Sequence, residues 1–88
     1  MYNLTLIIPA KEEKYSLPMV LDEVKDLNLK KLVVLAEDDF ETREAVKNSD
    51  CEILFQTGKG YGNAIREGIK HATTKYIAIF MLMDQQIQ

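Results

Sequence analysis

The sequence contains a single cysteine, Cys51, and no apolar run long enough to cross a membrane. One cysteine excludes an internal disulfide and fits a reducing compartment, so we expect a cytoplasmic protein with Cys51 buried at the start of a strand. The longest apolar run, residues 76–83, is too short for a membrane span. The N-terminus lacks the basic region and cleavage site of a secretion signal. We therefore expect no transmembrane segment.

Clustered basic residues are also lacking. The formal net charge is −3, whereas a nucleic-acid-binding surface needs a concentration of lysine and arginine, so we expect no nucleic-acid partner. Hydrophobic residues make up 47% and charged residues 28% of the chain, which is ordinary globular composition. No repeat, linker or low-complexity segment divides the 88 residues, so we expect one domain spanning 1–88.

Four short apolar runs predict β-strands. They are LTLII (4–8), LVVL (32–35), EILF (52–55) and YIAIFML (76–82). Each run is rich in β-branched or aromatic residues and is mostly continuous rather than alternating. This pattern is typical of strands that are covered on both faces in a parallel sheet.

Amphipathic patterns between the runs predict three helices. The first has an apolar stripe at spacings of three and four: Leu17, Val20, Leu21, Val24 and Leu27. We expect Ser16 to be its N-cap, and Asp39 to cap a second helix over about 40–48. The third helix begins near Gly60, with an apolar face over 61–72. The alternation predicts an α/β fold with a parallel sheet in a three-layer βαβαβαβ, Rossmann-like arrangement.

Polar segments follow the predicted strands. They are PAKEE after the first, AEDD after the second, QTGKG after the third and MDQQIQ after the fourth. Ligands of open α/β sheets bind outside the carboxyl ends of the strands. We therefore expect the four segments to lie along one edge of the sheet and to form the functional site there.

The two acidic segments each allow two interpretations. Glu12 and Glu13 either accept hydrogen bonds from a base or ribose, or are solvated loop charges. The run Glu37–Asp39 either binds a base or a divalent metal, or caps a helix and places acidic charge in its first turn. The residues alone leave both pairs of alternatives open.

The third and fourth segments are equally ambiguous. Gly58, Gly60 and Gly62 with Lys59 either hold an anion before a helix N-terminus or form a tight turn without a ligand. Their spacing is neither a P-loop nor a dinucleotide fingerprint. Asp84 and Gln86 offer oxygen ligands that suit Mg²⁺ or Mn²⁺, or belong to a polar terminus. We assign no catalytic role to His71, near the end of the third helix.

Taken in order, the segments resemble the N-terminal half of a family 2 glycosyltransferase with the GT-A fold. The dolichyl-phosphate mannose or glucose synthase branch is the most similar, and the resemblance covers essentially the whole chain. Its most specific part is GKGYGNAIREGIKHA, which nearly reproduces the family's KG-G-A-R-G turn and helix. LTLIIPAKEE is similar to the family's IIPAYNEE opening.

The resemblance implies a nucleotide-diphosphate sugar as substrate and Mg²⁺ or Mn²⁺ as cofactor. The residues it assigns to the nucleotide are Pro9, Ala10, Glu12, Glu13, Glu37, Asp38, Lys59, Gly60 and Arg66. Glu37 and Asp38 compete for one position of the family's VVDDGS motif. At the family's Asp-X-Asp metal motif this chain has LMDQQ, so Leu82 replaces the first aspartate while Asp84 and Gln86 remain. This loss should lower the affinity for the metal.

The resemblance does not extend to the family's acceptor half, and it identifies no catalytic base. We therefore expect a truncated, glycosyltransferase-like protein that binds its donor and is weak or inactive alone. The alternative is a non-catalytic nucleotide-binding or self-associating α/β module. The fourth strand should leave an apolar edge, which a second copy in a homo-oligomer or a missing C-terminal half would cover. We reject a receiver-like signalling domain, since receivers carry their acidic pair after the first strand.

Overall fold

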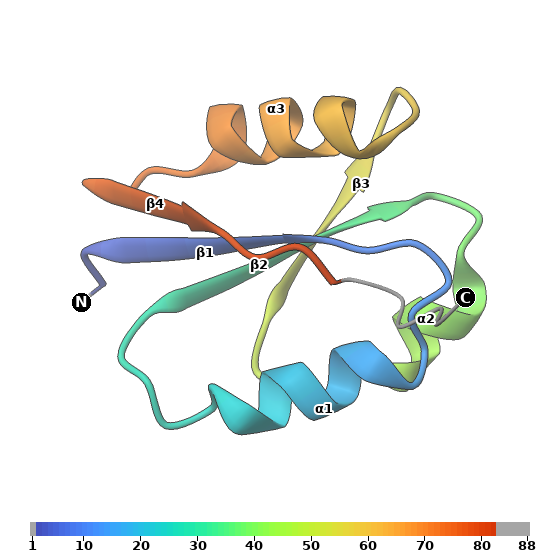
Figure 1. Cartoon of the computed structure of the whole chain (residues 1–88), viewed down its shortest axis with the longest axis horizontal. Helices are drawn as coiled ribbons and strands as arrows, with labels where there is room; N and C mark the ends of the chain where they lie inside the picture. The colour runs from blue at the N-terminus through green and yellow to red at the C-terminus, as the bar shows by residue number, and fades with distance from the viewer. Residues whose placement is uncertain (1, 83–88) are drawn as a thin grey trace, which may run out of the picture.

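The computed structural model describes residues 2–82. These residues form four strands and three helices in strict alternation (Figure 1). The strands are β1 (Leu4–Pro9), β2 (Lys30–Ala36), β3 (Glu52–Gln56) and β4 (Tyr76–Ile79). The helices are α1 (Ser16–Glu23), α2 (Phe40–Ala45) and α3 (Tyr61–His71).

All four strands pair in parallel, in the order β3-β2-β1-β4. Ile7 of β1 lies opposite Leu32 of β2 on one side and Ile79 of β4 on the other. The strand order therefore reverses between β1 and β4, as it does in Rossmann-like sheets, whereas receiver-like sheets begin with the order 2-1-3. The predicted α/β class and parallel sheet are confirmed.

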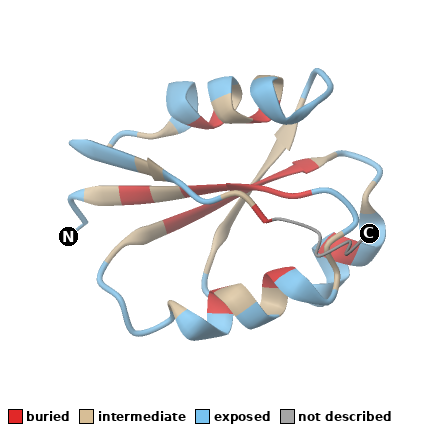
Figure 2. Ribbon diagram, in the orientation of Figure 1, coloured by how far each residue is buried: buried red, intermediate tan, exposed pale blue. Residues whose placement is uncertain are grey.

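Helices cover the two faces of the sheet separately (Figure 1). The cluster on the α1 and α2 side includes Ile8, Leu17, Leu21, Val33, Leu35 and Val46. The cluster on the α3 side comprises Ile7, Leu32, Val34 and Ala64. Figure 2 shows the buried residues concentrated on the two central strands and on the helix surfaces that face them. β1 and β2 are thus the rigid centre from which the loops at the carboxyl edge extend.

Gly68 allows α3 to approach the sheet closely. A Cβ atom at this position would lie 2.8 Å from Cγ2 of Ile7, which is buried in the core. The glycine in the middle of the helix is therefore explained by packing against β1, although glycine is a poor helix former.

The start and end of α1 differ from the prediction. Ser16 is the first helical residue and not the N-cap; Tyr15 occupies that position with helical dihedral angles and no side-chain cap. The helix ends at Glu23, and Leu27 beyond it is exposed. The Nζ of buried Lys31 donates to the carbonyl of Leu27 at 3.4 Å. This contact from β2 holds the chain in a turn where the apolar spacing alone would have continued the helix.

Two other elements are shorter than predicted. α2 ends at Ala45, and β4 ends at Ile79 although the backbone N–H of Phe80 still donates to Ile7. Cys51 lies just before β3 and is half-buried, not fully buried; burial raises the pKa of its thiol. No helix within residues 2–82 is long and apolar enough to cross a bilayer.

Candidate functional site

Parallel pairing brings the carboxyl ends of the strands to one edge of the sheet. β1 ends at Pro9, β2 at Ala36 and β3 at Gln56, and these three residues lie in neighbouring strands. The polar segments 10–15, 37–39 and 57–60 follow directly. Their predicted convergence is therefore confirmed. Of the fourth segment, the residues after position 82 lie outside the described part of the chain.

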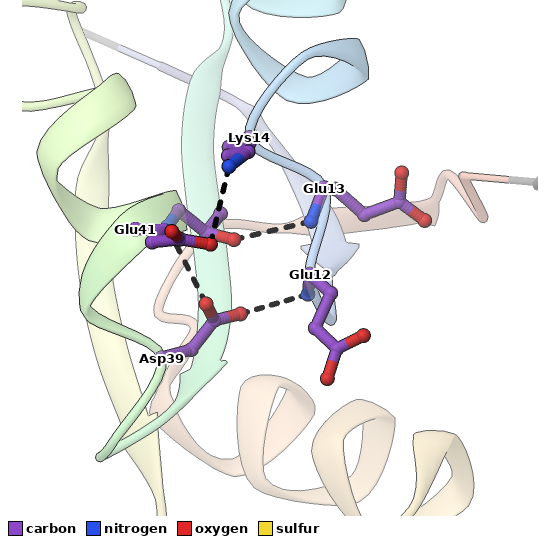
Figure 3. Close-up of polar contacts among 6 residues, drawn as sticks. Glu12, Glu13, Lys14, Asp39 and Glu41 are labelled. Carbon is purple, nitrogen blue, oxygen red and sulfur yellow. Dashed lines mark hydrogen bonds and ion pairs between the residues drawn. The ribbon is translucent and has the colours of Figure 1, made fainter.

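Asp39 links the first two segments (Figure 3). One carboxylate oxygen accepts a hydrogen bond from the Thr42 backbone at 3.4 Å, which confirms the predicted cap of α2. The other oxygen accepts from the backbone N–H of Glu12 at 2.8 Å. This second bond joins residues 27 positions apart, and no sequence pattern predicted it.

Two further contacts tie the segment after β1 to α2. The backbone N–H of Glu13 donates to the hydroxyl of buried Thr42 at 3.1 Å, and Lys14 pairs with Glu41 at 3.3 Å. The backbone amides of Glu12 and Glu13 are both occupied by the protein itself. Any role of these two glutamates in binding therefore rests on their side chains.

Glu12 adopts an unusual backbone conformation. Its φ is +54°, in the left-handed region that non-glycine residues rarely occupy. Such a conformation costs about 1–3 kcal/mol and persists where the surroundings hold it, here through the bond from Asp39. As a result, the Glu12 carboxylate points away from Asp39 (Figure 3).

A cavity of about 660 Å³ lies between the first two segments. Its lining residues are Lys11, Glu12, Lys14, Tyr15, Ala36, Asp38, Asp39, Phe40 and Glu41. The volume is in the usual range for small-molecule sites, and the lining combines carboxylates with two aromatic rings. Asp38 lines this cavity, whereas Glu37 lines a neighbouring depression together with Arg43 and Phe55.

A second cavity of about 390 Å³ adjoins the glycine-rich turn. It is lined by Ala10, Lys11, Ala36, Gln56, Gly58, Lys59, Gly60 and Tyr61. Lys11 and Ala36 line both cavities, so the two spaces flank one loop. The second cavity carries two lysine side chains from different segments and lacks the carboxylates of the first.

The structure explains why two positions of the turn are occupied by glycine. Gly60 is the N-cap of α3 with φ +86° and ψ 160°, a conformation almost restricted to glycine. A Cβ at Gly58 would lie 2.6 Å from Nδ2 of Asn63. A Cβ at Gly62 would meet nothing within 4 Å. The conformation and packing of a tight turn thus explain Gly58 and Gly60 but do not explain Gly62.

Four residues predicted to bind the nucleotide line neither cavity: Pro9, Glu13, Glu37 and Arg66. Pro9 is fully buried at the end of β1 and, as a proline, has no backbone N–H. The N–H of the neighbouring Ala10 donates to the carbonyl of Val34 at 3.0 Å, so it is not available to a ligand either. Arg66 is an exposed residue of α3 and lines neither cavity. Glu13 is partly buried beside the first cavity.

The described residues contain no ready-made metal centre. Within residues 2–82, no group of three His, Cys, Asp or Glu side chains is arranged to hold a metal ion. The interpretation of Glu37–Asp39 as a metal cluster therefore finds no support, since Asp39 is engaged by two backbone amides. The predicted ligands Asp84 and Gln86 lie outside the described residues.

The only histidine in the sequence lies far from this edge. His71 is at the end of α3, where its Nε2 lies 2.7 Å from the carboxylate of Glu52. Glu52 is the first residue of β3 and therefore marks the amino edge of the sheet. This hydrogen bond, followed by an ion pair with Lys30, holds the pKa of the Glu52 carboxyl below its ordinary value.

The sequence also matches a known family. The family model described as "Glycosyl transferase family 2" matches residues 5–82, nearly the whole chain. The chain belongs to glycosyl transferase family 2. Comparisons with curated proteins and with solved structures found no match. In this family 2 chain the matched region begins in β1 and includes all three described polar segments.

The sequence did not lead us to assign Lys11, Tyr15 or Phe40 to the site, although each lines a cavity at this edge. Tyr15 and Phe40 line the first cavity as exposed rings at the starts of α1 and α2. Each adjoins a polar segment in the sequence, and an exposed aromatic beside such a segment is the signal that would have found it. Lys11 lies within PAKEE, and it is the one residue of that segment that was not assigned to the nucleotide.

Proposed function

We propose that this family 2 chain binds the nucleotide-diphosphate part of a sugar donor at the carboxyl edge of its sheet, for transfer of the sugar to an acceptor. The observation that supports this most is the pair of cavities on either side of Lys11. One is acidic and aromatic, and the other is lined by glycine and lysine. These are the complementary surfaces that a nucleoside and a diphosphate require.

In this proposal the nucleoside occupies the first cavity. Asp38 accepts a hydrogen bond from the base, because it lines the cavity where Glu37 does not. Glu12 contacts the ribose, and the rings of Tyr15 and Phe40 supply apolar surface. Glu13 and Glu37 are alternative nucleoside contacts.

The diphosphate occupies the second cavity. Lys11 and Lys59 approach it from two segments and offset its charge, while Gly60 permits close approach of the backbone. Arg66 is a weaker candidate because it lines neither cavity.

A divalent cation, Mg²⁺ or Mn²⁺, completes the proposal. Asp84 and Gln86 are the residues that would hold it, because they follow β4 in the sequence and provide the oxygen atoms that such ions prefer. When bound, the ion would neutralise charge on the leaving diphosphate.

Within the family we propose a dolichyl-phosphate mannose or glucose synthase-like specificity, because that branch resembles the sequence most over essentially the whole chain. An acceptor hydroxyl or lipid phosphate would then attack the anomeric carbon of the sugar. We expect the 88-residue chain to bind its donor better than it transfers the sugar, because no residue is assigned as the base that activates an acceptor.

Thermal unfolding with added nucleotide tests the binding proposal. A ligand at ten times its Kd stabilises the native state by about 1.4 kcal/mol, which raises the Tm of a domain of this size by roughly 5–10 °C. UDP and GDP, each with and without Mn²⁺, are the probes, and uridine with Mn²⁺ is the control. The absence of any shift with millimolar UDP and GDP would contradict the proposal.

A second candidate function is self-association through β4. This edge strand exposes Tyr76 and Phe80 as well as Ile77 and Ile79. Ile79 lies opposite Ile7 and so belongs to the α3 face, where it is not covered. Parallel sheets normally have both faces covered, and an unpaired edge favours pairing with another chain. We propose that a second copy covers β4; a monodisperse monomer by light scattering at micromolar concentration would contradict this.

A further inference from the structure

Glu67 of α3 holds the glycine-rich turn from outside both cavities. Its carboxylate accepts hydrogen bonds from the Thr57 backbone at 3.0 Å and 3.1 Å and from the Thr57 hydroxyl at 2.8 Å. It also accepts from the backbone N–H of Gly58 at 3.2 Å. One side chain thus engages two consecutive amides and a hydroxyl directly after β3.

The charge of Glu67 strengthens these bonds. Hydrogen bonding, first from the Thr57 backbone and then from its hydroxyl, lowers the pKa of the Glu67 carboxyl, so the group is ionised at neutral pH. Hydrogen bonds to an ionised acceptor are stronger than those between neutral groups. Two successive amides around one carboxylate are the arrangement that binds anions in backbone nests. In this turn the anion is the Glu67 carboxylate of the protein itself.

Asn63 adds a second tie on the same side of α3, one turn earlier. Its side-chain oxygen accepts a hydrogen bond from Nε2 of Gln56 at 2.9 Å. The same Gln56 group donates to the carbonyl of Gly60 at 3.3 Å. Two helix side chains therefore hold the Gln56–Gly58 end of the turn, and the Gln56 side chain holds its Gly60 end.

We propose that Glu67 is a positioning residue for the diphosphate of the donor, acting through the turn that carries Lys59 and Gly60. This inference rests on the proposed function. Glu67 lines neither cavity, whereas Gly58, Lys59 and Gly60 all line the second. A turn with glycine at alternate positions has many accessible conformations, and binding would have to restrict them at a cost in affinity. The Glu67 carboxylate removes this cost before the ligand arrives.

The contacts of Glu67 also determine which backbone amides of the turn are already occupied. The N–H groups of Thr57 and Gly58 are engaged by Glu67, so they are not donors to the diphosphate. The basic residues that line the second cavity are Lys11 and Lys59. Glu67 and the diphosphate therefore use different parts of one turn and do not compete.

Two variants of Glu67 test the inference. Glu67→Ala removes all the acceptors, and Glu67→Gln keeps one oxygen for the Thr57 amide. Glu67 is only partly buried and alanine is the best helix former, so both variants should fold. Glu23→Ala is the matched control, because it removes the same charge from the end of α1 on the other face of the sheet.

The first measurement needs no ligand. Amide hydrogen exchange followed by NMR should show faster exchange at Thr57 and Gly58 in Glu67→Ala than in the wild type or the Glu23→Ala control. Unchanged exchange at these two amides would show that Glu67 does not fix the turn, and would overturn the inference whatever the chain binds.

The second measurement compares UDP, with Mg²⁺, and uridine by NMR titration. We expect Glu67→Ala to weaken UDP binding about tenfold and Glu67→Gln about threefold, from the usual worth of a few hydrogen bonds, with uridine binding unchanged. Equal losses for UDP and uridine would indicate a general structural role and overturn the inference. Tighter UDP binding would identify Glu67 as a competing anion, which also overturns it. Wild-type protein that binds neither UDP nor GDP would refute the proposed function, a result distinct from the variant effects.

Discussion

The carboxylate of Asp39 accepts a hydrogen bond from the backbone N–H of Glu12 at 2.8 Å and so connects the loops that follow β1 and β2. The same carboxylate caps α2 through Thr42. One side chain therefore fixes both walls of the first cavity, and Glu12 keeps its left-handed backbone as part of that arrangement.

Replacement of Asp39 should lower the free energy of unfolding, and alanine should lower it more than asparagine does. Asp39→Asn keeps an N-cap acceptor but loses the charge-assisted bond to Glu12, whereas Asp39→Ala loses both contacts. We expect Asp39→Ala to lower the free energy of unfolding by about 1–2 kcal/mol and Asp39→Asn by less. Urea denaturation measures this, with Asp22→Ala as control because Asp22 makes an exposed pair with Lys25 on α1. Equal effects of Asp39→Ala and the control would contradict the role of Asp39.

Gly60 and Gly62 should respond in opposite directions to the same substitution. Gly60→Ala forces a side chain into a conformation with φ +86° and should destabilise the protein by about 1–3 kcal/mol. Gly62→Ala has open space around the new methyl group and should stabilise α3 by roughly 0.5–1 kcal/mol. Thermal unfolding of the two variants checks this. A stabilising Gly60→Ala, or a destabilising Gly62→Ala, would show that the turn differs from the one described.

Glu52 should contribute stability that depends on pH. Its carboxyl pKa is lowered from 4.5, chiefly by the hydrogen bond from His71. A carboxyl group whose pKa is lower in the folded state stabilises the protein above its unfolded pKa, and this contribution is lost as the pH falls through the folded value. Because the side chain is 38% exposed, Glu52→Gln should cost only about 0.2–1 kcal/mol at pH 7. The difference in urea-unfolding free energy should stay nearly constant from pH 7 down to the unfolded pKa of 4.5 and shrink as the pH falls further through the lower folded value. A difference that does not shrink at acidic pH would contradict the assignment.

The metal proposal leads to a prediction about Asp84. Asp84→Ala should abolish the extra stabilisation that Mn²⁺ gives to the UDP complex, while the smaller effect of UDP alone remains. Thermal unfolding in EDTA and in Mn²⁺ separates the two contributions. Asp26→Ala serves as the control, because it removes one aspartate from the turn after α1. If the Mn²⁺ dependence survives in Asp84→Ala, another residue holds the ion.

Much of the fold could be predicted because the strand signal is local. Continuous apolar runs such as 4–8 and 52–55 locate β1 and β3, and their alternation with helices specifies parallel pairing. The end of α1 could not be predicted in this way. Its apolar spacing continues to Leu27, whereas the helix ends at Glu23 and the Leu27 carbonyl beyond it accepts a hydrogen bond from Lys31 of another element.

The candidate site was predictable at the level of segments but not of contacts. The rule that parallel strands end at one edge brought Glu12, Asp38 and Lys59 together. The bonds that shape the site join Glu12 to Asp39 and Thr57 to Glu67, across distances in the sequence that no local pattern records. The metal ligands Asp84 and Gln86 stay a prediction from the sequence.

The most direct test of the central claim is an NMR titration of ¹⁵N-labelled protein with UDP and with GDP, each with Mg²⁺. The account predicts that amide shifts concentrate in residues 10–15, 36–39 and 57–61 along the carboxyl edge, with little change at Asp50–Glu52 on the opposite edge. Shifts centred on the amino edge, or none with either nucleotide at millimolar concentration, would contradict it.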